Sequence, residues 1–280
     1  TKVIKGQVRA TNSLSTSAYV TTSNQVDAVD MDADAKAYFD AVAAAGGTLS
    51  GTEKSAYNTF VLAAKANGYY SKFKALYPML GASATACKFN AIDPRDLDAA
   101  YRLTFSGGIT YASTGITGNG TNGYGNTNYI RQTADRNDFG ITFYSRNVPS
   151  GGGYPGDIGV NSPAKYSFII LGSSPIYAIN AGGNNHPGST SSGLYAANRI
   201  SSTEQKMYVN GANTDTQITA STAVDSEPIY LLALNTSGSP SNYGNKECAF
   251  ASINASLSAA EHSNFYTDLQ AFQTTLSRQV

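Results

Sequence analysis

The last third of the sequence constrains the fold most strongly. Residues 207–211 end in Asn210-Gly211, a pair typical of the two-residue turn of a β-hairpin. Apolar runs follow at 228–235 and 248–253, and each is short enough for a strand and is bounded by turn residues. This order predicts a β-sheet protein whose strands are joined by tight turns.

A helix is predicted to follow these strands. Ser258 and Glu261 have the spacing of a capping box, so a helix should begin at Ser258. Apolar residues then recur at helical spacing. They are Phe265, Leu269, Phe272 and Leu276. We therefore expect an amphipathic helix within residues 257–276.

Short strands are predicted from about residue 85 onward. The clearest are 141–144 and 166–171, which are rich in aromatic and β-branched residues. Further strands are expected at 102–105, 195–200, 206–209, 217–220 and 229–234. Roughly ten such strands, joined by Gly, Asn and Ser turns, predict a sandwich of two facing antiparallel sheets.

The front of the chain has a different pattern. Residues 1–28 are polar and lack the material of a core, which indicates either an extended arm that contacts a partner or a strand on the sheet of its own domain. Residues 29–82 favour short helices that pack on a sandwich formed by residues 83–280. The expected helices are 32–46, which begins at an Asp cap, 50–68, which begins with a capping box, and 71–77, which ends before a proline.

Composition excludes some classes of partner. Lys+Arg and Asp+Glu are equal at 19 each, so net charge gives no attraction to nucleic acid or to an anionic membrane. No apolar run approaches the roughly 18 residues of a membrane-spanning helix. The chain has 19 tyrosines but no tryptophan, which counts against a sugar-cleaving enzyme or a dedicated glycan-binding module. Tyrosine can replace tryptophan in stacking on sugars, so this argument does not close the question.

The two cysteines, Cys87 and Cys248, allow two interpretations. Two buried free thiols fit the low cysteine content, because a disulfide-stapled secreted scaffold would carry more. A single bridge between the front of the sandwich and its last strand is the alternative.

No catalytic constellation is evident in the sequence. The acidic stretch 93–98 is best explained by local caps and by pairing of its Asp residues with Arg95. Glycoside hydrolysis needs two carboxyl groups across the scissile bond, and no strand presents alternating acids. The glycine-rich segment 118–125 lacks the Lys-Ser/Thr of a phosphate-binding loop. We therefore predict that the protein is not an enzyme.

The residues most suited to face a ligand are Tyr124, Tyr129, Asn184 and His186. The tyrosines follow a glycine-rich turn, and Asn184 and His186 lie in the loop 182–193. That loop and the loop 150–155 suit recognition of a sugar or a protein, although plain connection explains them equally well. Neither His186 nor His262 has the partners of a catalytic triad or a zinc site.

No cofactor is predicted. A structural calcium ion stays open as an alternative, because Asp135, Asp138 and Asp157 could supply carboxylate ligands. Backbone carbonyls usually supply much of a calcium shell, and the sequence does not reveal them.

Two resemblances support this interpretation of the fold. Residues 208–211, the strands at 229–234 and 249–253, and Leu257-Ser258-x-x-Glu261 resemble the end of laminin-G-like (concanavalin-like) sandwiches. This resemblance implies a jelly-roll of two antiparallel sheets, and most such domains bind or assemble.

A second resemblance covers most of residues 30–280. The stretches that carry it are Tyr70–Pro78, Lys88-Phe89-Asn90, Asp93–Leu103, Gly120-Thr121-Asn122 and Phe272–Leu276. They are similar to a group of bacteriophage virion proteins, for which no catalytic motif is established. The resemblance implies a structural subunit of the virion, such as a capsid decoration, a head fibre or a tail-associated protein. Residues 1–28 lie outside it.

The expected role follows from both resemblances. We expect a non-enzymatic virion subunit, assembled in the bacterial host cytoplasm, that contacts other virion proteins through residues 1–28 and forms a homo-oligomer. Contact with a host-surface glycan is compatible with this role. The alternative is a carbohydrate-binding adhesion module on a cell surface or a fibre. No nucleic-acid or membrane partner is expected.

Overall fold

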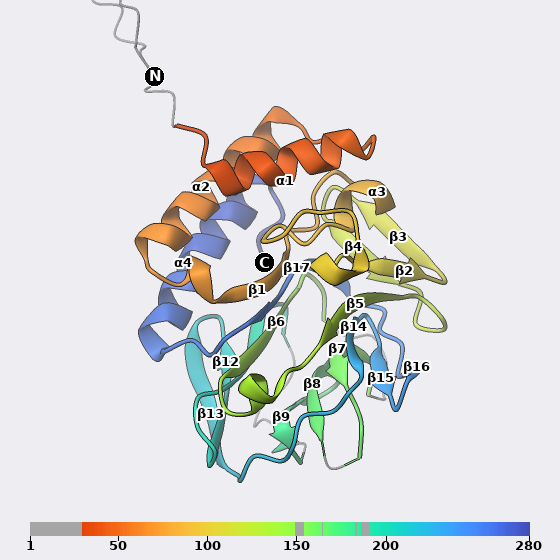
Figure 1. Cartoon of the computed structure of the whole chain (residues 1–280), viewed down its shortest axis with the longest axis vertical. Helices are drawn as coiled ribbons and strands as arrows, with labels where there is room; N and C mark the ends of the chain where they lie inside the picture. The colour runs from red at the N-terminus through yellow and green to blue at the C-terminus, as the bar shows by residue number, and fades with distance from the viewer. Residues whose placement is uncertain (1–29, 149–153, 164, 183, 186–190) are drawn as a thin grey trace, which may run out of the picture. The chain divides into compact units, whose positions relative to one another are not determined.

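The described strands form two sheets that face each other across an apolar core (Figure 1). The computed structural model describes residues 30–148, 154–163, 165–182, 184–185 and 191–280. Residues 31–280 form one unit, and the following account concerns that unit by itself. The predicted arm at 1–28 lies outside the described residues.

Sheet A contains eight of the described strands. Their order is β13 (Ala212–Ile218), β12 (Glu204–Val209), β11 (Gly193–Arg199), β6 (Phe139–Ser145), β17 (Glu247–Asn254), β4 (Gly115–Gly118) and β3 (Ile109–Ala112), with β1 (Phe73–Tyr77) paired to the far end of β17. The strand that is last in the sequence, β17, therefore lies inside the sheet.

Sheet B contains nine of the described strands. Their order is β10 (Asn184–Asn185), β9 (Pro175–Ala181), β8 (Tyr166–Leu171), β7 (Gly156–Val160), β14 (Pro228–Leu231), β5 (Tyr124–Ile130) and β2 (Thr104–Ser106), and the hairpin β15 (Leu234–Thr236)–β16 (Ser239–Ser241) joins at β7. The described pairs in both sheets are antiparallel except β15 with β7, which touch in parallel at Asn235 and Val160.

The core between the sheets follows from alternation along the strands. Phe139, Ile141 and Phe143 of β6 point inward, and Ile158 of β7 and Ile229 of β14 face them from sheet B. All five side chains are fully buried. Each such side chain contributes roughly 1.5–3 kcal/mol on leaving water, so this layer is a large part of the folding free energy.

Three of the four α-helices in the described residues begin where their caps predict. The four helices are α1 (Ala33–Ala44), α2 (Gly51–Ala66), α3 (Ala84–Cys87) and α4 (Ala259–Thr275), with short 3-10 turns η1 (Tyr70–Lys72), η2 (Asp98–Ala100) and η3 (Thr133–Arg136). Asp32 caps α1, and complete capping boxes begin α2 at Ser50 and α4 at Ser258. These three caps confirm the predicted starts.

Helices α1, α2 and α4 cover the outer face of sheet A (Figure 1). Phe60 of α2 and Phe265 of α4 contact Phe250 of β17, with ring centroids 5.6 and 5.8 Å apart. After α4, the fully buried Arg278 donates hydrogen bonds to the carbonyl oxygens of Pro78 and Met79. The helical layer and sheet A therefore share a second apolar core.

The predicted fold class is confirmed: the described unit is mainly β, with two facing sheets, a small helical region before them and an amphipathic helix after them. Cys87 and Cys248 are buried free thiols, as the first interpretation expected. The helical turn predicted at 71–77 is wrong, because residues 73–77 form β1 and pair with β17. Within the described residues, no helix is long and apolar enough to cross a membrane.

Candidate functional site

The outer face of sheet B differs from that of sheet A. The apolar cluster on this face consists of Phe168, Ile170, Ala178 and Leu234, with Tyr166 and Ile176 at its margin. All of these residues belong to strands, and none of the described α-helices contributes to the cluster. Phe168, Ile170, Ala178 and Leu234 are only 0–6% exposed, so a binding surface on this face would have to lie among the residues around the cluster.

Strand register aligns a row of side chains across this face. Tyr230 of β14 pairs with Asn126 of β5 on one side and with Gly159 of β7 on the other. Gly159 in turn pairs with Phe168 of β8. Because directly opposed residues share a face of the sheet, this row places an aromatic ring on each side of a glycine.

Three tyrosines gather at one end of this row, and we call them the tyrosine cluster: Tyr124, Tyr230 and Tyr243. The Tyr124 ring lies 4.8 Å from the Tyr230 ring and 6.3 Å from the Tyr243 ring, between centroids. Tyr230 is 7% exposed, whereas Tyr124 and Tyr243 are half-buried. The cluster therefore has a buried base and two rings that reach solvent.

A fourth tyrosine, Tyr154, lies on a segment that is hydrogen-bonded to the segment of Tyr243. Tyr154 is 62% exposed, and its carbonyl oxygen accepts a hydrogen bond of 2.9 Å from the Asn242 side chain. Since Asn242 directly precedes Tyr243, this bond holds the segment of Tyr154 beside that of Tyr243. An exposed aromatic residue on a segment next to partly exposed rings is typical of a recognition surface.

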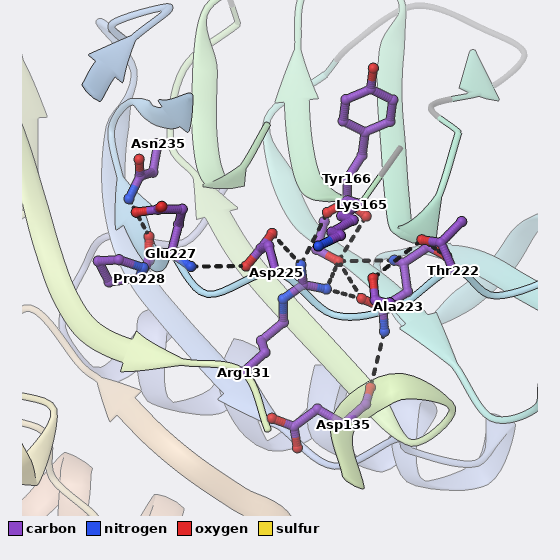
Figure 2. A network of polar contacts seen from close by, with 12 residues as sticks. Arg131, Asp135, Lys165, Tyr166, Thr222, Ala223, Asp225, Glu227, Pro228 and Asn235 are labelled. Carbon is purple, nitrogen blue, oxygen red and sulfur yellow. Dashed lines mark hydrogen bonds and ion pairs between the residues drawn. The ribbon is translucent and has the colours of Figure 1, made fainter. Parts of the chain in front are cut away.

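A buried polar network holds the segment that leads into β14 (Figure 2). The Arg131 guanidinium donates to the Asp225 carboxylate at 2.6 Å and to the Lys165 carbonyl oxygen at 3.1 Å. It also donates to the side chains of Ser167 and Asn180. Both members of the ion pair are buried, so loss of either one would leave the other without its counter-charge.

The same network continues toward the tyrosine cluster. The Glu227 backbone N–H donates to Asp225 at 3.3 Å, and the Asn235 side chain donates to the Pro228 carbonyl oxygen at 2.9 Å. These contacts fix the chain immediately before Tyr230. Burial, together with Tyr124 and Glu227, raises the pKa of the Tyr230 phenol, which therefore stays neutral and able to donate a hydrogen bond.

Of the four residues that the sequence suggested for ligand contact, Tyr124 lies in the tyrosine cluster. The prediction for Tyr129 is corrected, because this residue is only 4% exposed and its hydroxyl donates to Asp135 at 2.7 Å beneath the sheet. Burial raises the pKa of the Tyr129 phenol. Asn184 belongs to the short edge strand β10, and His186 lies outside the described residues.

Tyr230 and Tyr243 were not predicted from the sequence. Tyr230 could have been found, because it alternates with the apolar residues Ile229 and Leu231 and so faces away from the core. Tyr243 gives no such signal, because it follows β16 in a segment without periodicity. Only the folded chain brings it to Tyr124.

The acidic motifs resolve into local pairs. Arg95 pairs with Asp93, and Arg102 pairs with Asp96 and Asp98, as the local-pairing interpretation expected. Each of the three carboxylates suggested for calcium has a partner of its own. Asp135 pairs with Lys74, Asp138 accepts hydrogen bonds from Ser256, and Asp157 pairs with Lys246. The described residues contain no cluster of three His, Cys, Asp or Glu that could hold a metal ion.

A hollow in the described unit lies away from this face, at the start of α2. It has a volume of about 630 Å³ and opens widely to solvent. Glu53 lies in its wall, but that carboxylate already accepts hydrogen bonds from the backbone of Ser50 and Gly81. The Glu53 carboxylate therefore stabilises the start of α2.

Comparison with known proteins gives likenesses of fold. No protein-family model and no curated protein matches the chain. Among solved structures, domain 4 of AbnA, a GH43 extracellular arabinanase from Geobacillus stearothermophilus, in complex with arabinotriose, matches at 12% identity and a TM-score of 0.44, over 69% of this chain and 98% of that one.

Sialidases give similar matches. A Trypanosoma rangeli sialidase mutant with trans-sialidase activity aligns at 14% identity and a TM-score of 0.44, over 62% of this chain and 31% of that one. The NanB sialidase of Streptococcus pneumoniae aligns at 13% identity and a TM-score of 0.39, over 48% of this chain. This chain spans about a quarter of the length of NanB, 24%. These are likenesses to a β-sheet architecture and not to an activity.

Proposed function

We propose that this chain is a non-catalytic carbohydrate-binding module and that it binds sugar on the outer face of sheet B. The observation that carries the proposal is the tyrosine cluster, in which Tyr124 and Tyr243 reach solvent around the buried Tyr230. Aromatic faces stack on the apolar C–H faces of sugars, and phenol hydroxyls hydrogen-bond to sugar hydroxyls.

Preorganisation supports the same proposal. Tyrosine loses little conformational entropy on binding because it has two side-chain torsions. The Arg131–Asp225 pair fixes the backbone just before Tyr230, so the rings are held in place before a ligand arrives. A shallow, rigid aromatic face of this kind suits an extended or branched glycan more than a small buried ligand.

The proposed role does not include sugar cleavage. Glycoside hydrolysis needs two carboxyl groups facing each other across the scissile bond. On the segment that leads into β14, Asp225 is buried in its ion pair with Arg131. Glu227 therefore has no accessible carboxylate partner within that segment.

The test is glycan binding by the full chain and by tyrosine variants. A glycan array identifies a ligand, and calorimetry then measures its Kd. Tyr124→Ala and Tyr243→Ala should each weaken binding about fivefold or more, since one aromatic contact contributes about 1 kcal/mol. Tyr124→Phe keeps the ring but lacks the hydroxyl and is the matched control, and it should weaken binding less than Tyr124→Ala does. A blank array, or equal Kd values for Tyr124→Ala and the parent, would count against the proposal.

A second candidate is a structural subunit of a bacteriophage virion, assembled in the host cytoplasm. The observation that favours it is the resemblance of most of residues 30–280 to virion proteins, in stretches such as Lys88-Phe89-Asn90 and residues 93–103. Asn90 is central to this part of the fold, since its side chain accepts from the Leu76 N–H and donates to the Ala100 carbonyl oxygen. A virion subunit that binds a host-surface glycan would satisfy both candidates.

Mass spectrometry of gradient-purified particles tests the second candidate. Stoichiometric presence of the chain supports a structural subunit, and its copy number separates a capsid decoration from a few tail fibres. Absence from particles leaves the binding module on a cell surface or a fibre. Self-association through residues 1–28 or the sandwich can be measured on the same protein by analytical ultracentrifugation.

A further inference from the structure

Lys246 and Asp157 form a charged pair inside the sandwich. Both residues are 0% exposed, and the Lys246 Nζ lies 3.3 Å from the Asp157 Oδ1. Asp157 belongs to β7 of sheet B, whereas Lys246 immediately precedes β17 of sheet A. The pair therefore connects the two sheets through the core.

Hydrogen bonding leaves the two facing atoms of this pair unsatisfied. The Asp157 Oδ2 accepts a bond of 2.6 Å from the Leu171 backbone N–H. The other oxygen, Oδ1, and the Lys246 Nζ have no hydrogen-bond partner. A buried ammonium with three unpaired N–H groups is strongly disfavoured, and so is a buried carboxylate oxygen without a donor. Such a pair of atoms in a native core calls for an explanation.

Burial disfavours the charged form of the Asp157 carboxyl. Burial raises the pKa of Asp157 to about 6, although Lys246 and the Leu171 N–H act in the opposite direction. A covalent bond between the two side chains would remove both charges from the apolar interior. Such a bond would form from the carboxylic acid and the neutral amine, which is the nucleophile.

We propose that Lys246 and Asp157 join covalently, as an intramolecular amide bond between the Lys246 Nζ and the Asp157 Cγ. In this step the amine attacks Cγ, the Nζ–Cγ bond forms, and the bond from Cγ to Oδ1 breaks. One amine proton moves to the departing oxygen, which already carries the carboxyl proton, and one water molecule leaves. Nothing is oxidised or reduced, and no co-reactant is required.

The two carboxyl oxygens have the arrangement that this step needs. Oδ1 faces the amine and is free to leave, whereas Oδ2 is held by the Leu171 N–H. Negative charge develops on the oxygen that stays when the amine adds to the carbonyl carbon. A fixed backbone N–H aimed at that oxygen stabilises the charge, as in an oxyanion hole.

Intact-protein mass spectrometry of the purified full chain tests the proposal. The expected mass is that of the sequence minus one water molecule, and a lighter fraction that grows on incubation also supports the bond. Because a succinimide at any aspartate gives the same mass, tryptic mapping must follow. Trypsin should fail to cleave after Lys246, and a branched peptide containing both Asp157 and Lys246 should appear with fragment ions from both arms.

Lys246→Arg is the matched control. It keeps the positive charge beside Asp157 but lacks the nucleophilic amine, so its mass should equal that of its sequence. On a denaturing gel the cross-linked parent should migrate faster than this variant. If the parent shows its full sequence mass and cleavage after Lys246, the two residues form only an ion pair and the proposal is wrong. This decision needs the parent alone, even if Lys246→Arg does not fold.

Discussion

A buried imidazole links stability to pH at the scale of single residues. His262 of α4 stacks on Tyr208 of β12 with ring centroids 3.7 Å apart, and burial lowers its pKa to about 3. In the unfolded chain a histidine titrates near 6.5, so the unfolded state binds the proton more tightly. Stability from this residue is therefore fully present above about pH 6.5 and is lost as the pH falls toward 3.

His262→Phe tests this expectation, because phenylalanine keeps the stack and cannot bind a proton. We compare the free energy of unfolding of the parent with that of the variant. As the pH is lowered from roughly 6 to roughly 4, the parent should lose about 1.4 kcal/mol relative to the variant for each pH unit. Urea denaturation at several pH values measures it. Taking the difference cancels the contributions of the other titrating groups. Parallel pH profiles of the two proteins would contradict the assignment.

The alternation of side chains explains which candidate residues could be predicted. Tyr124 and Tyr129 lie on one strand at an odd spacing, so a regular strand places them on opposite faces. The sequence could therefore have shown that only one of the two faces a ligand, but it could not have shown which one. The choice depends on the partners of β5, since β14 and β2 flank it and set its inner face. Those partners come from distant parts of the sequence.

At the scale of elements, Gly159 determines how closely β7 and β8 approach. Its φ is +142°, and an added Cβ would lie 2.4 Å from the Phe168 Cα and 2.3 Å from the Ser167 carbonyl oxygen. Gly159→Ala should therefore lower the free energy of unfolding by about 1–3 kcal/mol through crowding and backbone strain. Gly51→Ala, at the start of α2 with open space around it, is the control and should be nearly neutral. Equal urea midpoints for the two variants would show that β7 and β8 adjust freely.

Local signals predicted the starts of α1, α2 and α4 but not the strand β1. The capping boxes at Ser50 and Ser258 are complete within a few residues, so their sequences suffice to start α2 and α4. The segment 73–77 carries apolar residues that fit a helical turn and a strand equally well. The segment forms a strand because it pairs with β17, with Phe73 opposite Asn254. A local sequence pattern cannot reveal a partner so distant in sequence.

At the scale of the described unit, the helical layer and sheet A should unfold together. Phe60 is 1% exposed and contacts rings from α2, α4 and β17, among them Phe250 and Phe272. Phe60→Ala should cost about 3–5 kcal/mol, because the cavity lies where the two layers meet. Far-UV circular dichroism and the near-UV signal of the tyrosines should then shift to the same lower urea midpoint.

Ser55→Ala, at an exposed position of the same helix, controls for the effect of substitution in α2 and should change stability little. Separate transitions in the two signals for Phe60→Ala would mean that the helices unfold independently of the sandwich.

The position of β17 has a consequence for how the chain is made. This strand lies between β6 on one side and β1 and β4 on the other, although it follows all of them in sequence. A ribosome must therefore pass residue 254 before sheet A can close. Until then, the edge of β6 is unpaired and can associate with neighbouring chains on the polysome. This risk of aggregation ends only when β17 has emerged and paired with β6.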